Sequence, residues 1–72
     1  MDREFERLQT TLAANVQRLR IAKNLTQEQL AFDAEIDRTY VSQIERSLKN
    51  PSLLILHKLA KTLDSTVIRL LS

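Results

Sequence analysis

The segment TQEQLAFDAEIDRTYVSQIERS, residues 26–47, predicts two short helices joined by a tight turn and decides the fold of this chain. Thr26 and Asp37 stand at the two expected helix starts, where a side-chain oxygen can accept from backbone N–H groups that are otherwise unpaired. The apolar residues of each helix recur on one face, which indicates that both helices lie on a common core. These expected core residues are Leu30, Ala31, Ala34, Val41 and Ile44.

The outward positions of the second helix are polar or basic. They are Arg38, Thr39, Ser42, Gln43 and Arg46. Side chains of these types exchange hydrogen bonds with base edges and with phosphates. The connecting residues 34–36 have about the length of the turn in a DNA-binding helix-turn-helix. Residues 26–46 therefore predict a helix-turn-helix whose second helix enters the major groove.

The flanking sequence predicts three further helices. Residues 2–23 place apolar side chains at three- and four-residue steps, and a second such pattern follows Ser52 as far as about residue 62. A break at residues 64–66 precedes a last short helix over 67–71. The first helix is expected to contribute to the core with Leu8, Leu12, Val16 and Leu19. With no strand signal, the chain is expected to form one all-α domain of five helices over residues 1–72.

The chain contains no glycine. Glu35 in the turn and Ser47 after the second helix stand where a positive φ is expected, and a non-glycine residue costs roughly 1 kcal/mol there. Two alternatives remain open at Glu35: the residue adopts the strained conformation, or the turn is built differently. Asn24 is expected to end the first helix in the left-handed region.

Composition excludes several classes of site. Without cysteine there is no disulfide framework, thiolate metal site or cysteine nucleophile. The longest apolar run, residues 53–56, is far too short to span a membrane, and no signal-peptide pattern opens the chain. His57 is the single histidine and has no second ligand at metal spacing, so it is expected on the surface. We expect a cytoplasmic protein with no membrane contact, metal, cofactor or enzymatic activity.

The charge of the chain is unevenly distributed. Residues 1–37 carry five Lys/Arg and seven Asp/Glu, a net charge of −2, whereas residues 38–72 carry six and two, a net charge of +4. The sign changes at the start of the proposed recognition helix. Such a distribution suits a protein that turns one face toward a polyanion, although an ordinary solvated surface explains it equally well.

The run LTQEQLAFDAEIDRTYVSQIERSLKNPSL, residues 25–53, resembles the phage-repressor-like Xre family of helix-turn-helix regulators, and the likeness continues through LHKLAKTLDSTVIRLL, residues 56–71. Within that family, DRTYVSQIER (37–46) followed by KNPS (49–52) is most similar to the controller proteins of restriction–modification systems. The resemblance implies a homodimer that binds double-stranded, palindromic operator DNA and regulates transcription. Two dimers on one operator, and RNA polymerase, are further candidate partners.

The resemblance also implies residue roles. Arg38 could bond bidentately to guanine O6 and N7, a contact worth ~1–3 kcal/mol of discrimination. Arg20 and Glu45 would form a partly buried ion pair between the first helix and the recognition helix; two solvated charges are the alternative. The positions that match base readers are Arg38, Thr39, Ser42 and Gln43. The positions that match DNA-backbone contacts are Gln27, Arg46, Lys49 and Asn50, and Ser52 would add a hydroxyl. For Tyr40 two alternatives remain open: its hydroxyl reaches a phosphate, or the residue only packs.

A dimer surface is expected within residues 53–72. Leu54, Ile55 and Ile68 are apolar at positions that are polar in most members of the resembled family. With Val67 and Leu71 they would form a two-fold interface that places two recognition helices about 34 Å apart, one turn of DNA. Scattered surface apolar groups are the alternative.

A different class of function is an antitoxin-like protein-interaction module in which DNA binding is secondary and autoregulatory. The polar outward face of residues 38–46 argues against this class, because a protein-binding surface would be more apolar there. Two aromatic residues lie outside the predicted site. Phe32 is expected to be partly buried, and Phe5 is a candidate contact with a partner chain.

Overall fold

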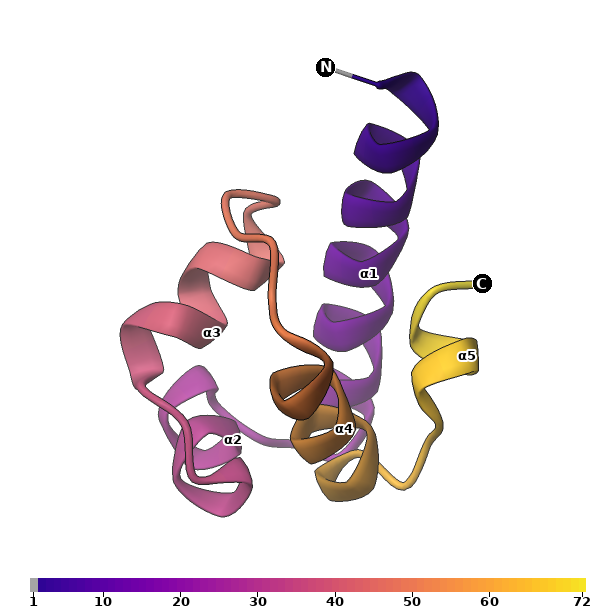
Figure 1. Ribbon diagram of the computed structural model, residues 1–72. Coiled ribbons are helices and arrows are strands. Elements are labelled where there is room, and N and C mark those ends of the chain that lie inside the picture. The colour runs from indigo at the N-terminus through magenta and orange to yellow at the C-terminus, as the bar shows by residue number, and fades with distance from the viewer. Residues whose placement is uncertain (1) are drawn as a thin grey trace.

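The computed structural model describes residues 2–72, which form five α-helices and no strand (Figure 1). The predicted all-α fold of five helices is therefore confirmed. In chain order the helices are α1 (Arg3–Ala22), α2 (Gln27–Ala34), α3 (Arg38–Glu45), α4 (Leu53–Thr62) and α5 (Val67–Leu70). None of them is both long and apolar enough to cross a membrane.

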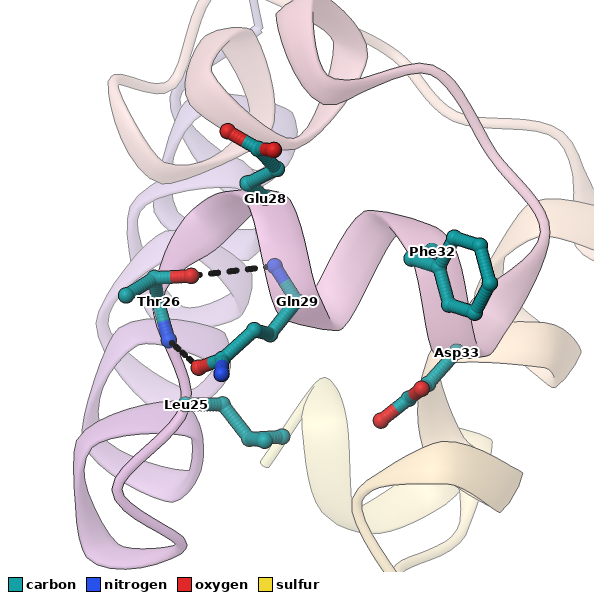
Figure 2. Close-up of a pocket in the computed structure, with 6 residues that line it drawn as sticks. All are labelled: Leu25, Thr26, Glu28, Gln29, Phe32 and Asp33. Atoms are coloured by element: carbon teal, nitrogen blue, oxygen red, sulfur yellow. Dashed lines mark hydrogen bonds between the residues drawn. The ribbon is translucent and has the colours of Figure 1, made fainter.

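Each helix begins at a polar side chain that accepts a hydrogen bond from the first turn. At α2 this is a reciprocal capping box: Gln29 N–H donates to Thr26 Oγ1 at 3.0 Å, and Thr26 N–H donates to Gln29 Oε1 at 2.8 Å (Figure 2). The other four helices are capped by Asp2, Asp37, Ser52 and Thr66. The predicted caps at Thr26, Asp37 and Ser52 are confirmed. Short-range chemistry thus defines where the helices start.

Four helices end at a non-glycine residue in the left-handed region. Between α2 and α3, Glu35 has φ 58° and ψ 46°, and Ile36 N–H donates to Ala31 O at 2.9 Å, which closes the helix end. Glu35 therefore adopts the strained conformation, and the turn keeps the geometry that glycine would give it. The positive φ values within residues 2–72 are 57° at Asn24, 58° at Glu35, 60° at Ser47 and 54° at Asp64. The sequence pattern did not single out Asp64.

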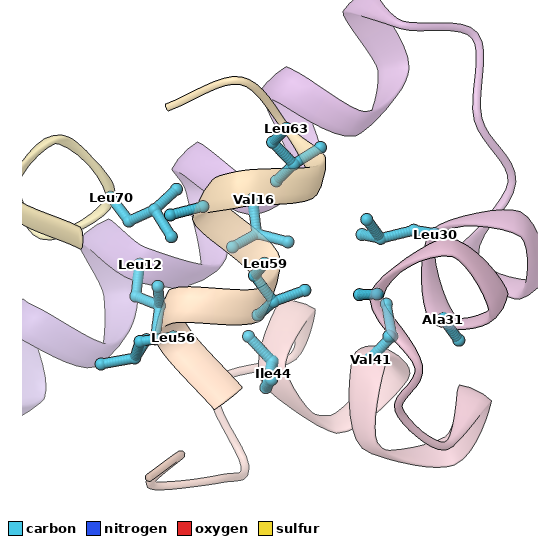
Figure 3. Packing of buried hydrophobic residues seen from close by; sticks show 12 residues of the cluster. Leu12, Val16, Leu30, Ala31, Val41, Ile44, Leu56, Leu59, Leu63 and Leu70 are labelled. Atoms are coloured by element: carbon cyan, nitrogen blue, oxygen red, sulfur yellow. The ribbon is translucent and has the colours of Figure 1, made fainter. Parts of the chain in front are cut away.

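The helices pack around one hydrophobic cluster (Figure 3). α1 lies against α3 and α5, α4 lies against α2 and α5, and α2 lies against α3. Leu12 and Val16 of α1 are buried as predicted, and Leu19 packs half-buried beside them. The buried cluster consists of Leu12, Val16, Leu30, Ala31, Ala34, Val41, Ile44, Leu56, Leu59, Ala60, Leu63 and Leu70.

The first turns of α1 extend beyond the other helices (Figure 1). For that reason the prediction of Leu8 as a core residue is wrong, and 40% of its surface is exposed. Leu8 and the half-buried Phe5 instead line a shallow apolar hollow, together with Leu12, Pro51 and Leu71. Helical periodicity finds the apolar stripe of a helix, but the length over which a neighbour covers it depends on packing.

Candidate nucleic-acid interface

Helix α3 is anchored by one edge and open at the other. Val41 and Ile44 are buried in the core, at 0% and 1% exposure. On the outward edge Arg38 and Thr39 are exposed, as is Arg46 just after the helix. The other two outward residues, Ser42 and Gln43, are half-buried. The predicted polar edge is therefore accessible to a large ligand, and no part of residues 2–72 seals it.

The start of α2 meets the first half of α3 in a shallow depression. It is lined by Gln27, Arg38, Thr39 and Ser42. The fold thus brings one expected phosphate-contacting residue beside three expected base-reading residues. Such a hollow between the two helices of the motif presents donors and acceptors from both to the same stretch of a ligand.

A buried ion pair fixes α3 to the rest of the protein. Arg20 Nε–H donates to Glu45 Oε2 at 2.7 Å, and Arg20 Nη2–H donates to Oε1 at 3.0 Å. The two side chains are only 13% and 2% exposed. Arg20 Nη1–H also donates to Leu25 O at 2.8 Å, and Gln27 Nε2–H donates to Glu45 Oε1 at 3.1 Å. The bidentate pair and its extra partners satisfy both charges and set the orientation of α3.

The loop after α3 carries a basic residue that packs on an aromatic ring. Lys49 Nζ lies 5.6 Å from the centroid of the Tyr40 ring, within the range of a cation–π contact. Gln9 Nε2–H of α1 donates to Lys49 O at 3.3 Å. The Tyr40 ring is half-buried against the core, whereas Lys49 and Asn50 are exposed. These contacts hold an ammonium group close to α3.

Within residues 38–52 the exposed charges are all basic, whereas Asp37, the N-cap residue of α3, is exposed and acidic. Residues 38–52 contain one acidic side chain, Glu45, and it is buried against Arg20. The remaining charged side chains of this segment, Arg38, Arg46 and Lys49, are all exposed and basic. A polar edge with only positive exposed charges is suited to a polyanionic ligand such as the DNA backbone.

Residues 16–70 match the family described as helix-turn-helix, HTH_3. The chain belongs to this family of helix-turn-helix proteins. It is 41% identical over 68 residues to control protein C.SmaI of Serratia marcescens, over 94% of this chain and 81% of the relative. The solved restriction–modification controller protein C.AhdI of Aeromonas hydrophila is 40% identical, with a TM-score of 0.82 over 86% of this chain and 94% of that chain.

A third relative is SinR, a master regulator for biofilm formation that was solved in complex with DNA. It is 34% identical, with a TM-score of 0.81 over 85% of this chain and 98% of that chain. These comparisons confirm the resemblance to Xre-type regulators. The chain is a DNA-binding helix-turn-helix regulator of transcription.

This helix-turn-helix protein also exposes apolar side chains on α4 and α5. Leu54 and Ile68 are 60% and 79% exposed. The other three residues of the expected dimer surface, Ile55, Val67 and Leu71, are half-buried and pack against the core. Leu53 is 72% exposed and belongs to the same run of apolar residues at the start of α4. Helical spacing predicts that Leu53 shares the face of Leu56, Leu59, Ala60 and Leu63, but those four residues are buried and Leu53 is not.

Phe32 departs from its prediction. The expected partial burial is wrong, because 83% of the residue is exposed. The buried face of α2 is formed by Leu30, Ala31 and Ala34, and this face leaves the Phe32 ring on the outer side of the helix. Figure 2 shows the ring standing clear of the ribbon. The groove that it lines also includes Leu25, Thr26, Glu28, Gln29 and Asp33.

The remaining predicted residues fall where solvent reaches them. His57 is exposed on α4, as expected. Ser52 is exposed and caps α4 with its side-chain oxygen, which accepts from Ile55 N–H at 3.2 Å. No group of three or more His, Asp or Glu side chains within residues 2–72 is arranged to hold a metal ion.

Proposed function

We propose that this protein is the controller protein of a restriction–modification system, a homodimer that regulates transcription from a palindromic operator. The observation that carries the proposal is the open polar edge of α3, with Arg38 and Thr39 exposed and the opposite edge buried. The similarity to the controllers C.SmaI and C.AhdI supports it.

In this proposal α3 reads base edges in the major groove. Arg38 donates to guanine O6 and N7, and Gln43 exchanges a pair of hydrogen bonds with an adenine. Thr39 contributes its hydroxyl or its methyl group, the latter against thymine, and Ser42 contributes a hydroxyl. The buried Arg20–Glu45 pair gives these side chains a fixed angle to the groove.

The DNA backbone is held on both sides of α3. Gln27 at the start of α2 reaches a phosphate while keeping its hydrogen bond to Glu45. The remaining proposed backbone contacts are Tyr40, Arg46, Lys49, Asn50 and Ser52. Contacts of this kind fix register and orientation, and they make binding fall steeply as salt concentration rises.

The proposed dimer uses the apolar surface of α4 and α5. Leu54 and Ile68 are its exposed members, and Ile55, Val67 and Leu71 lie at its base. A two-fold arrangement would place the two copies of α3 about 34 Å apart and so match two half-sites on one face of the duplex. Two such dimers on adjacent sites of one operator complete the proposed assembly.

The proposal is tested by DNA binding. Footprinting upstream of the gene for this protein, across a range of protein concentrations, should show a protected palindrome. In the variant Arg38→Ala the preference for that site over random DNA should fall about 5- to 150-fold, the equivalent of ~1–3 kcal/mol. Arg7→Ala, at an exposed position of α1, is the matched control. Retained site preference in Arg38→Ala would rule out the proposed reading helix.

RNA polymerase is a further proposed partner, and the outer face of α2 is the surface that favours it. This face presents the exposed Phe32 ring between the exposed acidic residues Glu28 and Asp33. Aromatic residues anchor many protein interfaces, and an acidic rim complements a basic partner segment. Phe32→Ala should leave operator affinity unchanged and lower activated transcription of a reporter gene.

The same exposed face is the one observation that favours a second candidate function, an antitoxin-like interaction module with autoregulatory DNA binding. Under that alternative Phe32 would anchor a toxin rather than the polymerase. Purification of the native protein from its host distinguishes them. A stable hetero-complex without an operator footprint would favour the antitoxin, whereas an operator footprint with no such complex would favour the controller.

A further inference from the structure

Asn15 of α1 donates hydrogen bonds to three carbonyls more than fifty residues further along the chain. Its Nδ2 lies 3.2 Å from Arg69 O, 3.0 Å from Leu70 O and 3.1 Å from Ser72 O. A primary amide has two hydrogens, so at least one of them is shared between two acceptors. Arg18 Nη2–H donates to Asn15 Oδ1 at 3.3 Å, and this contact orients the amide with its nitrogen toward the carbonyls.

The helix that receives these hydrogen bonds cannot hold itself in place. α5 has four residues, and a helix of that length is far too short to be stable alone. The last carbonyls of a helix have no partner within it; here Arg69 O accepts from Ser72 N–H at 3.3 Å and from Asn15, and Leu70 O accepts from Asn15. Leu70, at 0% exposure, is its one fully buried side chain. Val67 and Leu71 pack half-buried beside it, and the amide of Asn15 adds a polar attachment at the C-terminal end of the helix.

The orientation of α5 matters for dimerisation because it determines where the exposed side chain of Ile68 lies. Ile68 is 79% exposed and is one of the two exposed residues of the proposed dimer surface on α4 and α5. α5 packs against α1 and α4, so a rotation about Leu70 would move Ile68 relative to both helices. In a two-fold interface the same displacement occurs in both copies, so its effect on the dimerisation free energy is doubled.

We propose that Asn15 is a positioning residue for self-association: it fixes the angle of α5 and so presents Ile68 to a second copy of this chain. This inference rests on the proposed homodimer. Asn15 contacts neither DNA nor the second copy, and it acts only through α5. Its counterpart on the DNA side is the Arg20–Glu45 pair, which orients α3 from the same helix α1.

The decisive variant is Asn15→Asp, which keeps the shape of the side chain but replaces the donor by an acceptor that the three carbonyls repel. Gln17→Glu, at an exposed position two residues along α1, makes the same change from amide to carboxylate and is the matched control. Sedimentation equilibrium should show the dimer dissociation constant raised about tenfold or more in Asn15→Asp. The constant should be unchanged in Gln17→Glu.

Two further measurements separate positioning from a general loss of stability. Amide hydrogen exchange in Asn15→Asp should accelerate in α5 and stay unchanged in α2 and α3. At protein concentrations above the raised dimer constant, operator affinity and its salt dependence should return to the wild-type values, because α3 and its phosphate contacts are intact. Binding that stays weak at every concentration would contradict the inference.

Asn15→Ala removes the donor without adding charge and covers the case in which Asn15→Asp fails to fold, judged by circular dichroism. It should weaken the dimer in the same direction. A wild-type dimer that persists unchanged in both Asn15 variants would overturn the role of Asn15 and leave the proposed function intact. A wild-type protein that binds its operator as a monomer would instead overturn the proposed homodimer.

Discussion

The surface around α3 and the surface on α4 and α5 are built in opposite ways. Next to α3, the charges of Arg20 and Glu45 are removed from solvent and pair with each other within one chain. On α4 and α5 the apolar side chains of Leu53, Leu54 and Ile68 are left uncovered. The first surface is complete in a single copy and presents polar groups to a ligand. The second surface leaves apolar area in water that a second copy could cover.

The difference shows that apolar burial and polar contacts have separate roles in this 72-residue chain. The small core uses apolar burial to hold the helices, and polar contacts from α1 then set the angles of α3 and α5. Breaking a buried polar contact should cost folding stability, whereas breaking an exposed apolar contact should cost only association. The predictions below test this division, beginning with the largest expected effect.

The largest effect is expected at the buried ion pair. Glu45→Ala leaves the Arg20 guanidinium buried without its counter-charge and should lower the free energy of unfolding by ~3–5 kcal/mol, measured by urea denaturation. Operator binding should fall with it, because α3 loses its fixed angle. The double replacement Arg20→Met, Glu45→Leu removes both charges and should recover most of the stability. Equal destabilisation by the single and double variants would contradict this explanation.

A smaller and different effect is expected at the apolar surface. Ile68→Ser should leave the unfolding free energy of the monomer within about 0.5 kcal/mol of wild type, because the side chain is already exposed. Dimerisation should weaken by ~1.5–3 kcal/mol for each copy, since each loses one apolar side chain from the interface. Ile21→Ser is the control, at an apolar residue that is 56% exposed near the end of α1. Analytical ultracentrifugation should separate the two variants, and equal dimer constants would place the interface elsewhere.

The smallest effect is expected at the turn between α2 and α3. Glu35→Gly relieves a left-handed conformation at φ 58° and should raise the unfolding free energy by roughly 1 kcal/mol. Asp64→Gly, at the end of α4, should gain less, because aspartate tolerates this region and its carboxylate forms an ion pair with Lys23. Asn24→Gly should gain less, because asparagine tolerates this region. Thermal unfolding measures all three, and a loss of stability at Glu35→Gly would show that its side chain contributes more than its backbone strain costs.

Much of the fold could be read from short-range patterns. The caps at Thr26, Asp37 and Ser52 form as predicted, since each involves residues two or three positions apart. The buried faces of α2 and α3 were likewise found by their spacing. The backbone conformation of Glu35 could be determined only from the structure, because the sequence allowed either a strained residue or a different turn.

The outward edge of α3 was placed by the same spacing argument, and Arg38 and Thr39 are exposed where the sequence put them. Spacing alone did not identify the groups that orient that edge. The pairing of Arg20 with Glu45 was implied by the family resemblance, but the hydrogen bond from Gln27 to the same carboxylate was not. That bond links α2 to α3, and with Arg20 it joins three helices at one carboxylate, which no spacing along the chain predicts.

What the sequence determined by itself was which residues begin each helix and which face of each helix is apolar, because caps and periodicity depend on neighbours within one or two turns. Only the tertiary structure decided which apolar side chains are buried and which polar groups make long-range hydrogen bonds. Leu8 and Phe32 are exposed because no helix reaches them, and Asn15 is engaged because the end of α5 does reach it. Exposure and long-range hydrogen bonding depend on the arrangement of distant segments, and that arrangement is set by the packing of the whole core.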